Sequence, residues 1–204
     1  MSSNLPEDLP HQIREAAKLH ERAREQARSA LSARAERSSM QICQALSDAA
    51  DAWVLAVWEH TAPADLREAS ALYALGGFGR QELSFGSDLD VLIEVHDPTL
   101  LERAETSEII EQWMRHCRVT RVKLSHAVRS PAQGREELER DWRTPVALLD
   151  ARALLVGDGV DLDASIAHSA ALRALRATDQ GTHFVELLIE GYRARRDRHG
   201  QTVY

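Results

Sequence analysis

The chain of 204 residues is 44% hydrophobic, enough to fill the core of one large domain or of a domain with a helical extension. Its formal net charge of -7 argues against a general nucleic-acid binder, because affinity for the phosphate backbone depends on clustered Lys and Arg. The two cysteines, Cys43 and Cys117, indicate neither a disulfide framework nor a zinc site, and without a leader or a ~20-residue apolar run we expect a cytoplasmic protein with no membrane span.

The first sixty residues are rich in helix-forming Ala, Arg, Glu and Gln, and residues 6–60 predict two helices. The first helix has a narrow apolar stripe amid dense charge, so we expect it on the surface. Its stripe consists of Ile13, Ala16, Leu19, Ala23, Ala27 and Leu31. The second helix has a broad apolar face that should pack on the core, formed by Leu46, Ala50, Trp53, Val54 and Val57. Acidic residues interleave with the bases from Arg14 to Arg37, which favours a solvated face for that stretch.

Strand patterns follow in the middle of the chain. Residues 72–75 predict a short buried strand that ends at the glycine pair 76–77. Residues 88–95 alternate, so that four apolar side chains share one face of a strand and two aspartates share the other. Residues 99–117 are periodic enough for a helix, and residues 118–129 alternate again as a third strand.

Helical patterns return after Pro131. We expect helices at about 132–141, 144–155, 162–177 and 179–198, with a turn at Gly157–Gly159. The chain therefore divides into an N-terminal helical extension (1–62), a core (63–130) and a C-terminal helical region that packs on the core (131–204). A few strands within a mostly helical chain indicate an α+β or α/β fold.

The segment of residues 76–90, GGFGRQELSFGSDLD, carries the chemistry. Glycines after a strand allow main-chain amides to approach a phosphate closely, although the spacing matches neither a Walker loop nor a dinucleotide-binding fingerprint. Asp88 and Asp90 on one strand face are hard oxygen ligands, and magnesium commonly bridges such carboxylates to substrate phosphates. The pattern therefore predicts a magnesium-nucleotide site; the alternative is a plain loop followed by exposed aspartates on an edge strand.

This segment closely resembles the GGxGRxELxxxSDxD signature of the protein-PII uridylyltransferase family, within the DNA polymerase β-like nucleotidyltransferase superfamily. Three further stretches support the resemblance. Residues 125–130 (SHAVRS) resemble the family's GHSVRT strand, residues 147–152 (ALLDAR) its ALLDAR helix, and residues 198–204 the segment before its next motif. The resemblance implies a small mixed β-sheet of the nucleotidyltransferase type, flanked by helices, with helical extensions at both ends.

Transferred to this sequence, the family's pattern assigns a role to each residue of the motif. Gly76, Gly77 and Ser87 would hold triphosphate oxygens, and Asp88 and Asp90 would bind Mg2+. Arg80 and Glu82 would either stabilise the loop as an ion pair or lie on the phosphate side. The implied reaction is transfer of UMP from UTP to a tyrosine hydroxyl of a PII-type signal protein, with release of pyrophosphate.

The chain departs from the superfamily at one place. Other members supply a third carboxylate from a later strand, but the stretch Lys123 to His126 contains none. His126 is a candidate accessory residue for proton transfer or substrate orientation, with a structural histidine as the alternative. Three functions follow: a uridylyltransferase-like enzyme, an inactive nucleotide-sensing or scaffold module, or an adenylyltransferase with a different acceptor. Nothing in the sequence sets the oligomeric state.

Overall fold

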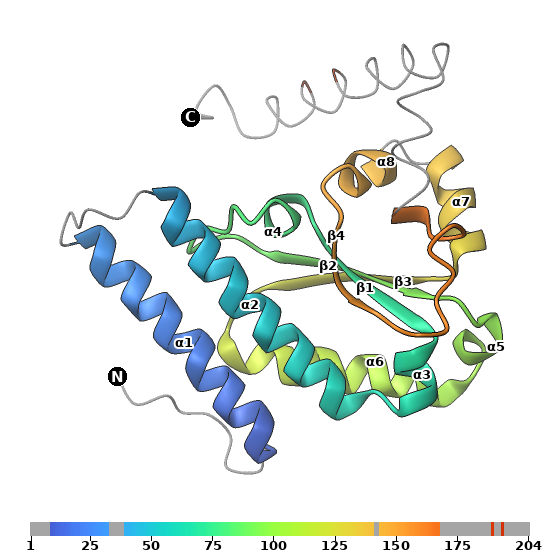
Figure 1. Cartoon of the computed structure of the whole chain (residues 1–204), viewed down its shortest axis with the longest axis horizontal. Coiled ribbons are helices and arrows are strands. Elements are labelled where there is room, and N and C mark those ends of the chain that lie inside the picture. Colours follow the sequence, from blue (N-terminus) through green and yellow to red (C-terminus); the bar gives the residue numbers. More distant parts are fainter. Residues whose placement is uncertain (1–8, 33–38, 141–142, 168–188, 190–192, 194–204) are drawn as a thin grey trace.

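The computed structural model describes residues 9–32, 39–140 and 143–167, together with Ile189 and Arg193. Within these ranges one four-stranded sheet lies between helices, which confirms the expected α+β class with a small mixed sheet (Figure 1). The helix expected at 179–198, most of the one expected at 162–177, and the motif at 198–204 lie outside the described residues.

The elements follow one another closely along the described chain. In order they are α1 (His11–Ser32), α2 (Ser39–Thr61), α3 (Ala64–Glu68), β1 (Ser70–Leu75), α4 (Gly76–Gly79), β2 (Leu89–Val95), α5 (Pro98–Leu101), α6 (Ala104–Cys117), the short 3-10 helix η1 (Arg118–Thr120), β3 (Leu124–Arg129), α7 (Pro131–Arg140), α8 (Arg143–Leu148) and β4 (Arg152–Val156).

The sheet is mixed, with strand order β3-β2-β1-β4. β1 is antiparallel to both β2 and β4, whereas β2 and β3 run parallel. The end of β1 and the starts of β2 and β3 therefore meet at one end of the sheet. The glycine segment and the two aspartates belong to that end, because they follow β1 and begin β2.

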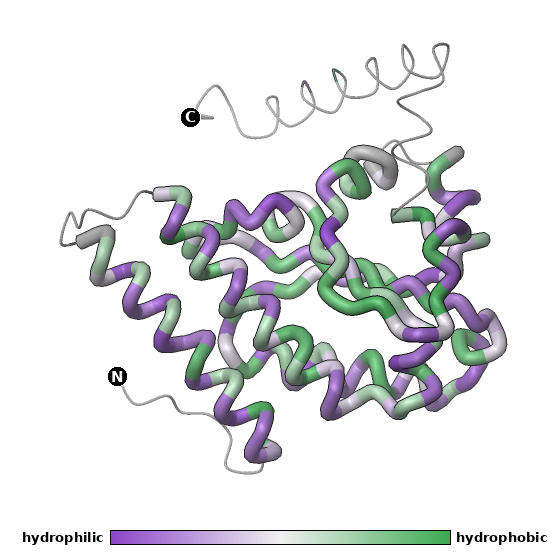
Figure 2. Tube along the Cα trace, in the orientation of Figure 1, coloured by the Kyte–Doolittle hydropathy of each residue, from purple (hydrophilic) through white to green (hydrophobic). Residues whose placement is uncertain are grey.

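One face of the sheet is covered by α2 and α6, with α1 packed outside α2 (Figure 1). The predicted apolar face of α2 is confirmed, since all five of its predicted residues are buried. Trp113 of α6 lies edge-on to Trp58 of α2, with ring centroids 6.0 Å apart, and its indole N–H donates to the Val54 carbonyl. Figure 2 shows hydrophobic residues concentrated along the strands and hydrophilic residues recurring along α1.

The stripe of α1 is correct in part. Ile13 and Ala27 are buried against α2, but Leu19 is 59% exposed. Ala17 and His20 are buried instead, and the His20 ring lies 6.5 Å from that of Trp53. In this part of α1 the buried positions are therefore 17 and 20 instead of the predicted 16 and 19. The His20 imidazole packs there against the Trp53 indole of α2.

The opposite face of the sheet carries a smaller core. Tyr73 and Leu92 pack there with Leu148 of α8 and with Ile166. Glu94 is fully buried beside them; its carboxylate accepts hydrogen bonds from His96 Nε2 at 2.8 Å and from the Ile166 amide at 2.9 Å. The bond from Ile166 holds the described part of the segment after β4 against the sheet.

Two expectations for the second half of the chain are wrong. The helix predicted at 144–155 ends at Leu148, and residues 152–156 form β4, which pairs with the free edge of β1. An unpaired strand edge is costly to leave bare, so the aliphatic run after Asp150 is used as a strand. The strand predicted at 118–129 begins only at Leu124, because Arg121 has a left-handed φ of 58°.

The helix predicted at 99–117 is divided into α5 and α6, and the turn at residues 157–159 is present, although it follows a strand. Within the described ranges no helix has the length and apolar character needed to cross a membrane.

Candidate functional site

The glycine segment turns the chain sharply at the end of β1. Gly76 has a left-handed φ of 54°, a conformation that costs other residues about 1–2 kcal/mol. A Cβ at this position would lie 3.7 Å from Asp90 Oδ2, so the main chain passes directly beside that carboxylate. Gly79 is required for another reason, because a Cβ there would overlap the carbonyl oxygen of Asp150. Gly77 is less constrained, with only Glu82 O at 4.0 Å.

Asp90 lies on the face of β2 that is opposite to α2 and α6, and Asp88 lies near it, one residue before the strand begins. Asp90 is half-buried and pairs in register with Leu75, the last residue of β1. Asp88 is exposed and lies just before the strand. Burial raises the pKa of the Asp90 carboxyl, a hydrogen bond from Ser125 lowers it, and the negative charge of Asp88 raises it further. Each carboxylate therefore acts in the field of the other, which is the condition for sharing a cation.

β3 contributes two residues that the sequence pattern did not single out. Ser125 lies beside Asp90 in the parallel register and hydrogen-bonds its carboxylate. Lys123 Nζ lies 3.9 Å from Asp88 Oδ1, and the Lys123 carbonyl accepts the Leu89 amide at 2.8 Å. The alternation of β3 could have revealed both residues, since positions 123 and 125 share a face. The start of β3 thus presents the Ser125 hydroxyl, and the residue before the strand presents the Lys123 ammonium group.

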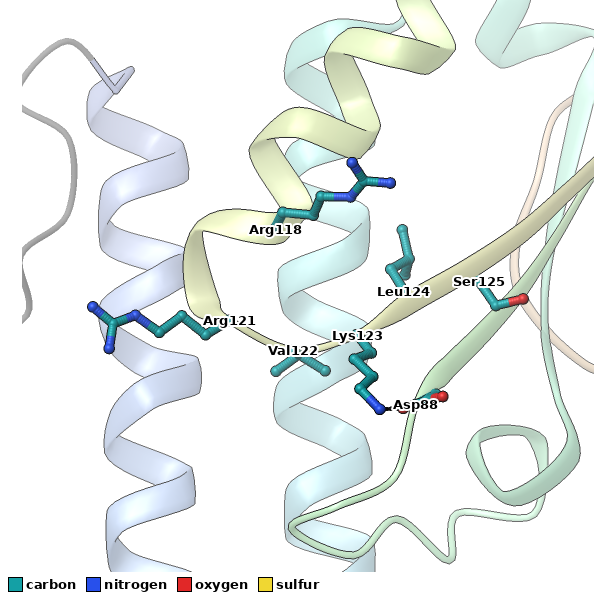
Figure 3. Close-up of a pocket in the computed structure, with 7 residues that line it drawn as sticks. All are labelled: Asp88, Arg118, Arg121, Val122, Lys123, Leu124 and Ser125. Atoms are coloured by element: carbon teal, nitrogen blue, oxygen red, sulfur yellow. Dashed lines mark ion pairs between the residues drawn. The ribbon is translucent and has the colours of Figure 1, made fainter.

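A cavity of about 470 Å³ opens next to Asp88 (Figure 3). It is lined by Asp88, Arg118, Arg121, Val122, Lys123, Leu124 and Ser125. Figure 3 shows Arg118 and Arg121 extending from the connection between α6 and β3, and Lys123 extending towards Asp88. The cavity, called the β3 pocket below, is therefore basic apart from the single carboxylate at its inner edge.

Arg80 and Glu82 form an ion pair, with Arg80 Nε 2.7 Å from Glu82 Oε2, and Arg80 also pairs with Asp150. The hydrogen bond to Glu82 is the main cause that raises the pKa of Arg80. Asp150, expected on a helix, lies in the turn before β4 and connects that turn to the glycine segment. Of the two roles expected for this pair, the contacts correspond to stabilisation of the loop.

Ser87 is part of the tight turn that leads into β2. Its hydroxyl oxygen accepts the Ser84 amide at 2.9 Å and lies 3.0 Å from the Ser84 hydroxyl. The Ser87 amide in turn donates to the Ser84 carbonyl at 3.2 Å. The side chain of Ser87 thus sets the shape of the loop that delivers Asp88.

The loop is also held from the helical side of the sheet. Arg152 forms two hydrogen bonds to the Asp51 carboxylate of α2, at 2.8 and 2.9 Å. The same guanidinium donates to the carbonyls of Phe78 and Gly79 and lies over the Phe78 ring. Gln81, with a left-handed φ of 59°, donates to Asp48 of α2. These anchors come from distant parts of the sequence, and no local pattern indicates them.

His126 is separated from the two aspartates. It pairs in register with Val91, whose side chain belongs to the core under α2 and α6, and its ring lies 6.5 Å from that of Trp113. Burial lowers the pKa of His126, and the nearby Arg118 lowers it further. Asp88, Asp90, Gly76 and Ser125 lie together on the other face of the sheet, so the structure does not bring His126 to them.

The donor atoms at the site fit magnesium. No group of three or more His, Cys, Asp or Glu side chains suited to a metal occurs among the described residues, so the protein offers two carboxylates and the Ser125 hydroxyl. Magnesium is often held by one or two carboxylates while it keeps waters and binds substrate phosphates. A Cβ at Gly76 would lie 3.7 Å from Asp90 Oδ2, so the glycine main chain borders the carboxylate that would hold the metal.

Comparison with known proteins gives a partial relationship. No family model matches the chain. The chain is 34% identical over 115 residues to a protein of Burkholderia pseudomallei (strain K96243) that is named bifunctional uridylyltransferase/uridylyl-removing enzyme. The matched segment covers 56% of this chain and 13% of that protein. Proteins of the same name in Burkholderia vietnamiensis (strain G4 / LMG 22486) and Burkholderia lata are 34% identical over 117 and 118 residues. These matches cover 55% and 56% of this chain, and 12% and 13% of the two relatives.

The matched segments therefore span only about an eighth of the length of these relatives. Their name supports UMP transfer as the general class of reaction for the matched part. The similarity agrees with the resemblance of the glycine and aspartate motif to uridylyltransferases, over somewhat more than half of the chain.

Proposed function

We propose that this chain contains a nucleotidyltransferase domain that transfers UMP from UTP to a hydroxyl group of a protein. The observation that carries the proposal is the position of Asp88 and Asp90 on one face of β2, with the main chain of Gly76 beside Asp90. The similarity to proteins named uridylyltransferase supports the same reaction. The core of this domain would be residues 63–130, with β4 added to its sheet and the helices of residues 1–62 as an extension.

The transfer joins the acceptor oxygen to the α-phosphorus of UTP. The bond from that phosphorus to the bridging oxygen of the β-phosphate breaks, pyrophosphate leaves with the electron pair, and the hydroxyl proton passes to solvent or to a basic group. Magnesium held by Asp88 and Asp90 would supply charge neutralisation on the phosphates. Gly76 and Gly77 would border the polyphosphate, and Ser87 would shape the loop that carries Asp88.

The residues around the site have positioning roles in this proposal. Ser125 orients the Asp90 carboxylate through its hydrogen bond. Arg80, Glu82 and Arg152 hold the glycine segment against the turn before β4 and against α2. A site fixed in this way is pre-organised, so less binding energy is lost in ordering the loop.

A tyrosine of a PII-type nitrogen regulatory protein is the acceptor that we propose, on the resemblance of the motif alone. The cytoplasm is the proposed location, since Cys43 and Cys117 are free thiols, as is usual in a reducing compartment. An inactive nucleotide-sensing or scaffold module is the competing function, because the stretch Lys123 to His126 contains no third carboxylate of the kind that the resembled superfamily supplies. An adenylyltransferase would share the site and differ only in the nucleotide that it accepts.

The test is a transfer assay with the full chain, Mg2+, each of the four NTPs labelled at the α-phosphate, and a PII-type protein as acceptor. We expect label on the acceptor with UTP, and loss of at least a hundredfold in rate for Asp88→Asn combined with Asp90→Asn. Arg115→Gln, an exposed change on α6, serves as the control and should leave the rate unchanged. Binding of Mg-UTP without any transfer would favour the sensing module, and transfer from ATP alone would favour the adenylyltransferase.

A further inference from the structure

The β3 pocket concentrates positive charge in a chain whose formal net charge is -7. Arg118, Arg121 and Lys123 lie within six residues of one another and are all exposed. Within the described part of the chain, neither arginine forms an ion pair, and Lys123 has only the 3.9 Å contact with Asp88. Some other exposed arginines have acidic partners, as Arg115 has Glu111 and Arg103 has Asp65. This local excess of positive charge is available to a ligand.

The position of the pocket relative to the aspartates follows from the sheet order. The glycine segment continues from β1, the aspartates lie at the start of β2, and the β3 pocket lies at the start of β3. Because β2 lies between β1 and β3, the glycines and the pocket are on opposite sides of the two carboxylates.

The geometry of phosphoryl transfer indicates on which side of the two aspartates the leaving group and the attacking hydroxyl lie. The attacking and leaving oxygens lie roughly in line, on opposite sides of the phosphorus. With the polyphosphate beside the glycines, the leaving pyrophosphate lies on the β1 side of the aspartates. The attacking hydroxyl must then arrive from the β3 side, past Lys123.

We propose that the β3 pocket binds an acidic segment of the acceptor protein, next to the hydroxyl that is modified. The inference rests on the proposed function and adds the chemistry of its acceptor. A volume of about 470 Å³ is within the range of ligand pockets and accommodates a few side chains. The three cations that line the pocket complement Asp and Glu residues that flank the hydroxyl, and Val122 and Leu124 add apolar lining.

The pocket is open to water, with the Lys123 side chain 83% exposed, so its interactions with an acidic segment are screened by salt. The affinity of the pocket for an acidic segment should fall as ionic strength rises. Changes in the pocket should alter the association with the acceptor more than the affinity for the nucleotide. Charge reversal in the pocket therefore separates the two substrates.

The test uses the full chain and a fluorescein-labelled random copolymer of Glu and Tyr at 4:1, with a Lys and Tyr copolymer as the basic counterpart. Fluorescence anisotropy measures copolymer binding at low salt, and isothermal titration measures Mg-UTP binding. The pocket variant combines Arg118→Glu and Arg121→Glu and leaves Lys123, which contacts Asp88, unchanged. The control combines Arg22→Glu and Arg115→Glu, two exposed changes outside the pocket that alter the net charge equally.

We expect the pocket variant to lose at least tenfold in affinity for the acidic copolymer, the control to lose less than threefold, and both to bind Mg-UTP within threefold of the unaltered chain. The corresponding double change, Arg118→Gln with Arg121→Gln, repeats the measurement without introducing negative charge. Equal losses in the pocket variant and the control, or tighter binding of the basic copolymer, would overturn the inference. Loss of Mg-UTP binding in the pocket variant alone would assign the pocket to the nucleotide instead.

The proposed function and this inference fail differently. If the unaltered chain binds no nucleotide in a manner that depends on Asp88 and Asp90, the proposed function is wrong. If nucleotide binding is intact and the pocket variant binds the acidic copolymer as tightly as the control does, only the inference about the acceptor is wrong.

Discussion

Gly79→Ala should destabilise the fold through a single methyl group. The Cβ would lie 2.8 Å from the Ala74 carbonyl oxygen and would overlap the Asp150 carbonyl oxygen. Both neighbours are backbone atoms, one at the end of β1 and the other in the turn before β4, so neither can rotate away. Gly79 does not have a left-handed φ, and conformational strain adds nothing to this steric cost.

The expected loss is about 3 kcal/mol in the free energy of unfolding, the upper part of the usual range for overpacking. For a chain of this length that corresponds to a fall of roughly 6–12 °C in Tm. Urea unfolding followed by circular dichroism measures the first quantity, and differential scanning calorimetry measures the second.

Gly77→Ala is the matched control, because it adds the same methyl group two residues earlier in the same turn. The nearest atom to that Cβ is Glu82 O at 4.0 Å, which is ordinary contact. Its stability should remain within about 0.5 kcal/mol of the unaltered chain. If Gly79→Ala were equally mild, the close packing of the glycine segment against the turn before β4 would be refuted.

His20, Arg152 and Asp90 give three further predictions. Burial lowers the pKa of His20 to about 4 from an ordinary 6.5, so the fold holds the imidazole neutral. The free energy of unfolding should fall by on the order of 3 kcal/mol as pH drops from about 6.5 to 4, and chemical unfolding across that range should show a smaller drop for His20→Gln. Arg152→Met removes the bonds to Asp51 and to the glycine turn and should cost about 2 kcal/mol in urea unfolding. NMR titration should place the pKa of Asp90 above its ordinary value, and Asp88→Asn should lower it by removing a repulsive charge.

Each of these has a contradicting outcome. A stability curve for His20→Gln that falls as steeply with acid as that of the unaltered chain would remove the buried imidazole as the cause. Additive losses in Arg152→Met and Asp51→Asn would mean that the two residues do not act as a pair, since coupled changes should not add. If the pKa of Asp90 is the same in Asp88→Asn as in the unaltered chain, the two carboxylates do not interact electrostatically.

The periodic patterns of α2 and β2 depend on neighbouring residues and predicted both elements. The broad apolar face of α2 and the apolar face of β2 are confirmed, because the side chains of each recur with the period of the element and all of them are buried. The other face of β2 is buried as well at Leu92 and Glu94, which alternation alone did not indicate. The prediction for the narrow stripe of α1 is wrong at Leu19, which is exposed. The neighbouring His20 packs against the Trp53 side chain of α2 instead, a contact that the pattern of α1 alone does not indicate. The strand β4 was missed because its pairing edge on β1 lies some eighty residues earlier in the chain.

By itself, the sequence determined the class of the fold, the glycine turn after β1, and the shared face of Asp88 and Asp90, all of which follow from spacings of a few residues. Only the tertiary structure decided which further groups reach that face. It joined Ser125 and Lys123 to the aspartates through the parallel register of β2 and β3, and it turned His126 to the opposite side. Strand register and the packing of distant segments depend on contacts across the whole chain, and these carry no local signature in the residues that make them.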